Sequence, residues 1–424
     1  MSAPVVDTST RPFPSSATTT PRPGDRPGPS GLRPGPGLIT LLGAMMAVFA
    51  VSVDMYLPSL PQVAAEMQVN EATAQLTISF MMIGAALGQL VVGPWSDRVG
   101  RRLPVLIGAS IHIAASLAVL LGSGIVVFLG LRMLQGVGAA ALGVCAQAFI
   151  RDRYTGPTAA AALSRLLLVV GVAPLFAPTV GGMIASVWDW RAVFAVLAGL
   201  GLLVLLAAWR FLPESRPRTT RTSGGLRTAL GNYRILLTDG RFLGFALLPG
   251  LVTGALIAYV SGSPFVLQTE LGLSAGQFSL FFAIGGVALV GMAQVNAAIV
   301  HKLSPSRIIG IALPLQLLTI LLMLAAALTG FGGTIGFLVL LVASVSFQNF
   351  VPPNAVALAL GSHGDRAGAA AAVLGALGAL LPAVISPLVG VLGGTAVAMS
   401  TVMALSIAAA LVVVLTATSV YRRP

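Results

Sequence analysis

The sequence predicts an all-α integral membrane protein, with twelve transmembrane helices arranged as two pseudo-symmetric bundles of six. Three observations support this fold class: a composition poor in charge, a series of apolar runs, and basic residues gathered on one side of those runs. Only 8% of the 424 residues are charged and 56% are hydrophobic. A water-soluble surface needs far more charge, whereas helices that face lipid need almost none. The composition therefore excludes a water-soluble fold.

The apolar runs begin at Leu38 and are each about 20 residues long, the length that an α-helix needs to cross ~30 Å of hydrocarbon. Backbone polar groups find no partner in lipid, so each run is expected to be a helix. The predicted spans are 38–58, 72–93, 103–122, 125–149, 163–187, 191–211, 242–268, 275–299, 306–328, 332–358, 368–392 and 395–419.

Short matches repeat between the two halves of the chain. Pro58 corresponds to Pro264, and Pro178 corresponds to Pro387. Parallel six-helix repeats are typical of transporters, which hold their substrate at the interface between the halves. The expected segments are a disordered cytoplasmic N-terminal tail rich in Pro, Ser, Thr and Gly (1–37), an N-terminal six-helix bundle (38–211), a cytoplasmic linker (212–241) and a C-terminal six-helix bundle (242–420).

The charged residues are sorted to the two sides of the predicted spans. Nearly all of the 24 Lys and Arg residues fall on the side of the N-terminal tail, whereas Glu66, Glu71, Asp189 and Glu270 fall on the other. Because basic loops stay in the cytoplasm, both termini are predicted to be cytoplasmic in a multi-pass protein of the bacterial cytoplasmic (inner) membrane. The net charge of +12 then reflects these loops and does not indicate a nucleic-acid partner.

Three segments carry motifs. The connection after the second span reads GPWSDRVGRR over 93–102, the fourth span contains RMLQG over 132–136, and the fifth contains GVAPLFAPTVGG over 171–182. The first resembles the signature of the major facilitator superfamily. The second and third resemble motifs of its drug:proton antiporters, with Ala177 where Gly is usual. The strings DMYLPSLP over 54–61 and SGSPF over 261–265 are similar to the bicyclomycin and chloramphenicol exporter branch (Bcr/CflA).

Asp54 and Arg132 are the candidate proton-coupling residues. Asp54 is the only acid inside a predicted span, and an acid in a helix that crosses a membrane usually faces a cavity and functions there. It lies roughly 24 Å along its helix from Leu38, so an acid at the level of the outer headgroups is the alternative. Arg132 lies at a comparable depth, and the two side chains are expected to share the cavity directly or through water, or to form a structural ion pair. The resemblance also implicates the fourth-span arginine in proton coupling.

Two further groups are predicted to control the transport path. Glycine and proline in the fifth span permit a bend and close helix packing, and the resemblance implies a gate at Gly171, Pro174, Pro178, Gly181 and Gly182. We also expect a cytoplasmic latch in which Asp97 caps a facing helix while arginines pair with Asp152 or Asp365. The predicted latch residues are Gly93, Asp97, Arg98, Gly100, Arg101, Arg102, Asp152 and Arg153.

The substrate site is expected to be mostly apolar, with a few polar and aromatic side chains, which suits lipophilic drugs. The substrate candidates are Tyr56, Gln135, Tyr259, Phe265, Gln348 and Asn349. No metal cluster, catalytic triad or phosphate-binding loop is present in the sequence. We therefore expect a non-enzyme without a cofactor, driven by the proton gradient and functioning as a monomer in the lipid bilayer.

These observations together predict proton-coupled efflux of small amphiphilic drugs, such as chloramphenicol- or bicyclomycin-like antibiotics, by alternating access. The alternatives are an uptake symporter of the same superfamily or an exporter of an endogenous metabolite. An integral-membrane enzyme would require clustered acids or histidines at a membrane face, and the acids here are dispersed. A sensor or scaffold would not need Asp54 and Arg132 within the membrane.

Overall fold

The computed structural model describes residues 35–122, 124–154, 156–216, 226–361 and 366–417, and this part of the chain contains helices and no strands. The N-terminal half comprises α1 (Pro36–Asp54), η1 (Leu57–Ser59), α2 (Leu60–Glu66), α3 (Glu71–Val99), α4 (Arg102–Val119), α5 (Ile125–Arg153), α6 (Gly156–Val187) and α7 (Trp190–Phe211). The connecting segment contains α8 (Leu226–Thr238). The C-terminal half comprises α9 (Gly240–Ser263), the π-helical turn η3 (Pro264–Glu270), α10 (Ala275–Ile299), α11 (Pro305–Thr329), α12 (Gly333–Ser346), η4 (Phe347–Asn349), α13 (Pro352–Gly361), α14 (Ala367–Ile385), α15 (Leu388–Val391) and α16 (Ala396–Ala417).

The described residues contain 11 spans that are long and apolar enough to cross a membrane. The remaining predicted span, 163–187, lies within α6, which runs without a break over 32 residues. The surroundings of several α6 residues, among them Gly171 and Pro174, lie outside what the structure describes. Nearly all of the predicted tail over 1–37 also lies outside the described residues. The helices thus occupy the places of the predicted spans.

Four of the predicted spans are interrupted, three near one end and the tenth near its middle. The first span breaks after Asp54 and continues as η1 and α2, and the seventh changes from α9 to η3 at Pro264. The tenth and eleventh spans also divide, at η4 and just before α15. Proline lacks the backbone N–H that an α-helix needs, which accounts for the breaks beside Pro58 and Pro264. The first and seventh spans are equivalent in the two halves, and their shared break lies at the corresponding residues Pro58 and Pro264.

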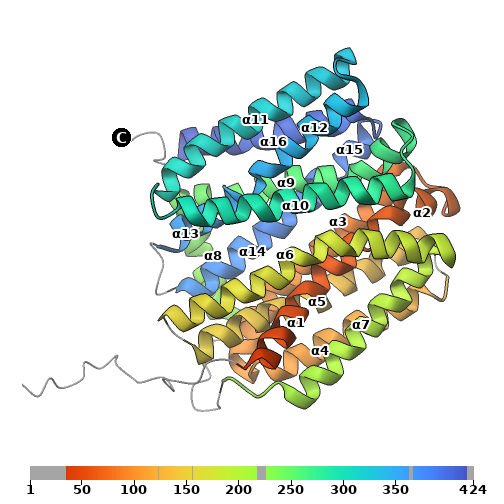
Figure 1. The fold of residues 1–424 in the computed structure, drawn as a ribbon. Coiled ribbons are helices and arrows are strands. Elements are labelled where there is room, and N and C mark those ends of the chain that lie inside the picture. Colours follow the sequence, from red (N-terminus) through yellow and green to blue (C-terminus); the bar gives the residue numbers. More distant parts are fainter. Residues whose placement is uncertain (1–34, 123, 155, 217–225, 362–365, 418–424) are drawn as a thin grey trace, which may run out of the picture.

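The two halves lie side by side, with the C-terminal half above the N-terminal half in Figure 1. They contact each other along two lines, α3 with α14 and α6 with α10. Both halves run between the same two ends. We call the end with the α3–α4, α5–α6 and α10–α11 connections the basic end, and the end with the α2–α3, α6–α7 and η3–α10 connections the acidic end.

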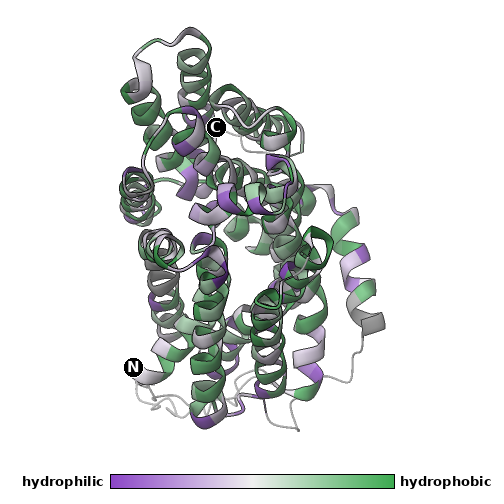
Figure 2. Ribbon diagram, turned by 90° about the vertical axis from the view of Figure 1, so that its right-hand side faces the viewer, coloured by the Kyte–Doolittle hydropathy of each residue, from purple (hydrophilic) through white to green (hydrophobic). Residues whose placement is uncertain are grey.

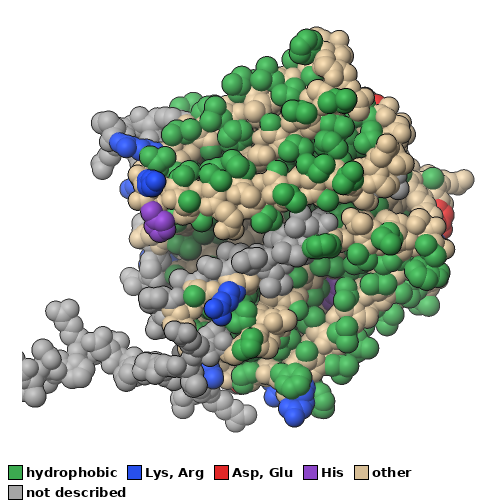
Figure 3. Space-filling model, viewed as in Figure 1, with side chains coloured by type: hydrophobic (Ala, Val, Ile, Leu, Met, Phe, Trp, Pro, Cys, Tyr) green, Lys and Arg blue, Asp and Glu red, His purple; other side chains and the backbone are tan. Residues whose placement is uncertain are grey.

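Charged side chains mark these two ends. Figure 3 shows Lys and Arg toward the left and lower edges of the molecule, Asp and Glu at the right edge, and hydrophobic side chains over the flank between them. The helices themselves are coloured mostly hydrophobic in Figure 2, with hydrophilic residues in short patches. An apolar flank between two polar ends is the surface expected of a protein that spans a bilayer.

The buried apolar core differs between the ends. One cluster joins residues of both halves, and it includes Leu57 and Leu60 from η1 and α2 together with Phe265 and Val266 from η3. A second cluster near the basic end, which includes Phe149, consists of N-terminal-half residues among those described. The two halves are therefore packed together at the acidic end in this structure.

Candidate functional site

Arg132 is completely buried in the N-terminal half. Its Nη1 donates to the Oε1 of Gln135 (2.8 Å) and the carbonyl of Ser52 (3.2 Å), and its Nε donates to the carbonyl of Thr77 (3.3 Å). The guanidinium also lies over the ring of Tyr56, 4.8 Å from its centre. Dipoles and an aromatic face rather than a carboxylate therefore stabilise this buried charge.

Gln135 and Tyr56 extend the network around Arg132. The Nε2 of Gln135 donates to the Oγ of Ser116 at 2.6 Å, which links α5 to α4. The Tyr56 hydroxyl accepts from the Oγ1 of Thr77 at 3.2 Å. Both Gln135 and Tyr56 are fully buried. As placed here, these two substrate candidates hold Arg132 inside one half of the molecule.

Asp54 lies at the end of α1 with 8% of its surface exposed. Among the described residues it forms no ion pair with Arg132, so the direct pairing expected from the sequence is absent from this structure. The guanidinium instead donates through Nη1 and Nε to three acceptors of its own half, while its Nη2 is buried and has no hydrogen-bond partner among the described residues. Asp54 instead interacts electrostatically with the hydroxyl of Tyr259, which belongs to the C-terminal half. The carboxyl group therefore lies near the C-terminal half.

Gly181 brings α6 against the chain directly after Asp54. A Cβ on Gly181 would lie 1.8 Å from the carbonyl oxygen of Met55, so only glycine allows this approach. A Cβ on the neighbouring Gly182 would lie 3.6 Å from Pro58 and from Ser279 of α10, which is ordinary contact. Pro178 is buried one turn earlier. The predicted gate glycines thus fix the position of the Asp54 segment and reach toward the other half.

The C-terminal half contains amides where the N-terminal half holds its guanidinium. Gln348 of η4 accepts a hydrogen bond from Gln316 of α11 at 3.4 Å, and Asn349 donates to the carbonyl of Leu289 at 2.8 Å. Tyr259 stacks on Phe282 with ring centres 5.7 Å apart, and Phe265 is buried in η3. Of these substrate candidates, Tyr259 interacts electrostatically with Asp54.

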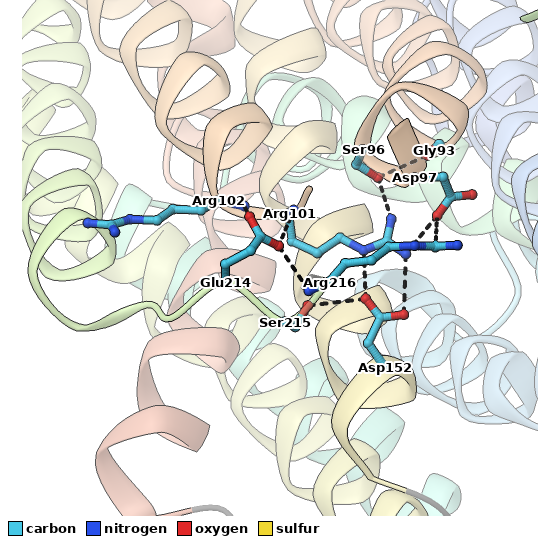
Figure 4. Close-up of polar contacts among 9 residues, drawn as sticks. All are labelled: Gly93, Ser96, Asp97, Arg101, Arg102, Asp152, Glu214, Ser215 and Arg216. Carbon is cyan, nitrogen blue, oxygen red and sulfur yellow. Dashed lines mark hydrogen bonds and ion pairs between the residues drawn. The ribbon is translucent and has the colours of Figure 1, made fainter. Parts of the chain in front are cut away.

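The predicted latch forms a cluster of charges at the basic end (Figure 4). Arg101 joins Asp97 (2.7 Å) to Asp152 (2.8 Å), and its Nη1 also donates to the Oγ of Ser96. Burial acts to lower the pKa of Arg101, but the carboxylates of Asp152 and Asp97 outweigh burial and raise it. The pairing of an arginine with Asp152 is confirmed. Asp365, the alternative partner, lies outside the described residues.

Two details of this cluster differ from the prediction. Asp97 does not cap a facing helix; it lies within α3, which continues to Val99, and pairs with Arg101 and with Arg216 (2.6 Å). The start of α4 is capped by Glu214, whose carboxylate accepts from the backbone N–H groups of Arg101 (2.8 Å) and Arg102 (3.3 Å). The turn between α3 and α4 is short because Gly100 adopts a φ of 101°, which favours glycine.

The remaining latch residues have smaller parts in the cluster. The carbonyl of Gly93 accepts from the Oγ of Ser96, and Arg102 donates to the carbonyl of Trp209. Arg98 and Arg153 are exposed. Sequence reasoning missed Glu214 and Arg216, although the PESR string over 213–216 was visible directly after the sixth span.

A comparison with known proteins decides the family. Residues 40–387 match the model of the Major Facilitator Superfamily. The chain belongs to this superfamily.

Relatives of this major facilitator support a role in transport. The chain is 36% identical to an uncharacterized MFS-type transporter, YdgK, of Bacillus subtilis over 86% of this chain and 91% of the relative. It is 27% identical to a bicyclomycin resistance protein homolog of Haemophilus influenzae, over 83% and 88%. It is also 29% identical to the multidrug resistance protein MdtL of Klebsiella pneumoniae, over 78% and 83%. The protein is accordingly a membrane transporter rather than an enzyme, and these relatives support drug efflux in general.

Solved structures agree with the fold of this major facilitator. The crystal structure of a D-xylose-proton symporter superposes with a TM-score of 0.72 at 18% identity, covering 91% of this chain and 99% of that one. At this identity the likeness establishes the fold alone. The predicted two-bundle membrane architecture is thereby confirmed.

Proposed function

We propose that the chain exports small amphiphilic drugs across the bacterial cytoplasmic membrane in exchange for protons, by alternating access of its two halves. The observation that carries this proposal is the position of Asp54, a buried carboxyl that interacts electrostatically with Tyr259 of the other half and pairs with no basic residue among those described. Burial without a cation disfavours the charged carboxylate, so Asp54 can take up a proton. Water that enters when the halves separate would favour its release.

Arg132 supports this exchange from within the N-terminal half. Its charge is fixed by carbonyl groups, an amide and an aromatic ring, and none of these groups needs to titrate near neutral pH. The guanidinium therefore supplies a constant positive field within the half that holds Asp54. Such a field favours the carboxylate once water reaches it, which lets one acid alternate between proton and substrate.

The residues near Asp54 and the names of the relatives support the proposed substrate class. Tyr259 and Phe282 offer an aromatic surface beside one carboxyl group, and the polar groups of the C-terminal half are uncharged amides. This arrangement favours neutral or monocationic amphiphiles over dications. The names of the multidrug and bicyclomycin resistance relatives point to the same class.

The orientation follows from the charges. Basic connections remain in the cytoplasm, so the basic end and both termini would be cytoplasmic and the acidic end would face outward. The structure would then be closed toward the outside. We further propose that the protein needs no cofactor and functions as a monomer.

Transport in proteoliposomes under an imposed pH gradient tests the proposal, with chloramphenicol and a lipophilic cation as substrates. Uphill movement is expected in the wild type and is expected to be lost in Asp54→Asn, while simple binding of the substrate persists. Glu66→Gln is the matched control, because Glu66 is an acid whose partners, Arg191 (2.7 Å) and Trp190 (2.6 Å), belong to its own half. Gradient-driven transport retained in Asp54→Asn would refute the role of Asp54. Uphill movement in the uptake direction would instead identify a symporter.

A further inference from the structure

The two halves meet at the acidic end through the start of α3 and the turn that contains α15. The Oε1 of Gln75 in α3 accepts a hydrogen bond from the backbone N–H of Gly390 at 3.1 Å. A Cβ on Gly390 would lie 2.5 Å from the Cα of Ala72, so the two backbones are in direct contact. This junction must separate whenever the acidic end opens.

Glu71 lies within this junction. A Cβ on Gly394 would lie 1.6 Å from its Oε2, so the carboxyl group occupies the space that only a glycine leaves free. That oxygen is buried and has no hydrogen-bond partner among the described residues. A carboxylate that loses water without gaining a donor is destabilised in its charged form.

A second carboxyl group, from the opposite half, approaches the same turn before α16 as Glu71 does. Glu270, the last residue of η3, accepts from the backbone N–H of Ala396 at 2.6 Å, which fixes its side chain at the start of α16. Glu71 and Glu270 interact electrostatically, and two negative charges at this position repel each other.

Other charged groups do not relieve this repulsion. Of the elements packed against α3 near this end, α2 carries only Glu66, and α14 and α15 carry no charged residue. α5 carries Arg132, whose guanidinium donates to the carbonyl of Thr77 in α3 and forms no ion pair with Glu71 among the described residues. Glu66 is already paired with Arg191, the one basic residue at the acidic end among those described. The pair of carboxyl groups therefore has no cation of its own in the described structure.

We propose that Glu71 is the proton-binding residue of a gate at the acidic end, with Glu270 as the charge that makes the gate sensitive to pH. In the closed gate Glu71 carries a proton. In the open gate it is hydrated and ionised, and its place in the first turn of α3 favours the negative charge there. The closed state binds the additional proton, so a fall in pH on this side stabilises closure and a rise stabilises opening.

This gate deepens the proposed proton antiport, and it rests on the proposed alternating access. A proton that binds at the acidic end would favour closure of the gate. Proton binding would thereby be coupled to the reopening of the transporter toward the cytoplasm. The role of Glu71 does not depend on Asp54. The two proposals can therefore fail separately.

Distances between spin labels across the acidic end test the gate in the full-length protein in lipid nanodiscs. Leu121 and Phe331 are suitable labelling sites because their loops belong to opposite halves and their side chains are 86% and 82% exposed. The single native cysteine, Cys145, is buried and is replaced by alanine for this purpose. Distances are recorded from mildly acidic to mildly alkaline pH, without substrate.

The wild type is expected to change from a short to a long distance as the pH rises. In Glu71→Gln the distance should stay short throughout. Glu270→Gln should lower the midpoint by about one pH unit, because Glu71 ionises more easily without a second negative charge nearby. Asp54→Asn should still open as the pH rises, because Glu71 remains, and the control Glu66→Gln should keep the wild-type response. A wild-type distance that does not change with pH would overturn the gate. A response that survives in Glu71→Gln, or disappears in Asp54→Asn or Glu66→Gln, would overturn it as well.

Discussion

The third and fourth spans of the two halves handle buried polarity in different ways. In the N-terminal half, α4 and α5 meet through Ser116 and Gln135, and this pair ends on the guanidinium of Arg132. In the C-terminal half, α11 meets α12 and η4 through Gln316 and Gln348, with no charged group among the described members of the network. The same helix positions thus carry a charge in one half and neutral amides in the other.

This difference suggests a division of labour between the halves. A buried guanidinium provides a fixed field that can act on a nearby acid, whereas amides can exchange hydrogen-bond partners at little cost. Asp54 belongs to the N-terminal half, and it interacts electrostatically with Tyr259 of the C-terminal half. We infer that the N-terminal half controls the proton and that the C-terminal half adapts to the substrate.

Removing the charge should produce the largest effect. Arg132→Leu is expected to lower gradient-driven transport by about a hundredfold or more, which corresponds to roughly 3 kcal/mol. The variant is also expected to lose about 1–3 kcal/mol of stability, because the Gln135 amide and the carbonyls of Ser52 and Thr77 lose their donor. Initial rates in proteoliposomes and a thermal unfolding curve measure the two quantities.

The control for this variant is Arg307→Leu, which removes an exposed arginine from the C-terminal half. It should leave transport near the wild-type rate, because exposed charges contribute little. If Arg132→Leu retained coupled transport, the division between a charged and an adaptable half would be wrong.

The equivalent glycines Gly181 and Gly390 provide a second test of the difference between the halves. Gly181 contacts Met55 within its own half, whereas Gly390 contacts Ala72 across the two halves. Gly181→Ala is therefore expected to destabilise the fold by about 1–3 kcal/mol, because its neighbour is backbone that must move. Gly390→Ala should leave stability near that of the wild type, because the junction can open instead.

Thermal unfolding and the label distances across the acidic end separate these two outcomes. Gly182→Ala is the matched control, since its Cβ would meet its neighbours at 3.6 Å, and it should change neither measurement. Equal loss of stability in Gly181→Ala and Gly390→Ala would show that the junction between the halves does not open readily.

The extent of successful prediction follows from which interactions leave a local pattern in sequence. Helix length and apolar composition are local, so the spans were predictable, and the arginine partner Asp152 followed from charge sidedness. The acceptors of Arg132 are backbone carbonyls of Ser52 and Thr77, which no side-chain pattern reveals. The cap of α4 by Glu214 depends on how the chain folds back after α7, which sequence spacing does not determine.

The smallest predicted effect concerns the two glutamines at equivalent positions, and it tests the comparison most directly. Gln135→Leu removes an acceptor 2.8 Å from a charged donor, so it is expected to cost about 1.5–3 kcal/mol of stability. Gln348→Leu removes a neutral contact at 3.4 Å and should cost about 1 kcal/mol or less. The paired replacement of Gln316 and Gln348 by Leu should recover that loss, because no partner is then left unsatisfied, and thermal unfolding of the three variants measures each step. Equal losses of stability in Gln135→Leu and Gln348→Leu would mean that the charge on Arg132 does not strengthen its hydrogen-bond network. The two halves would then differ in residue type but not in the energy of these contacts.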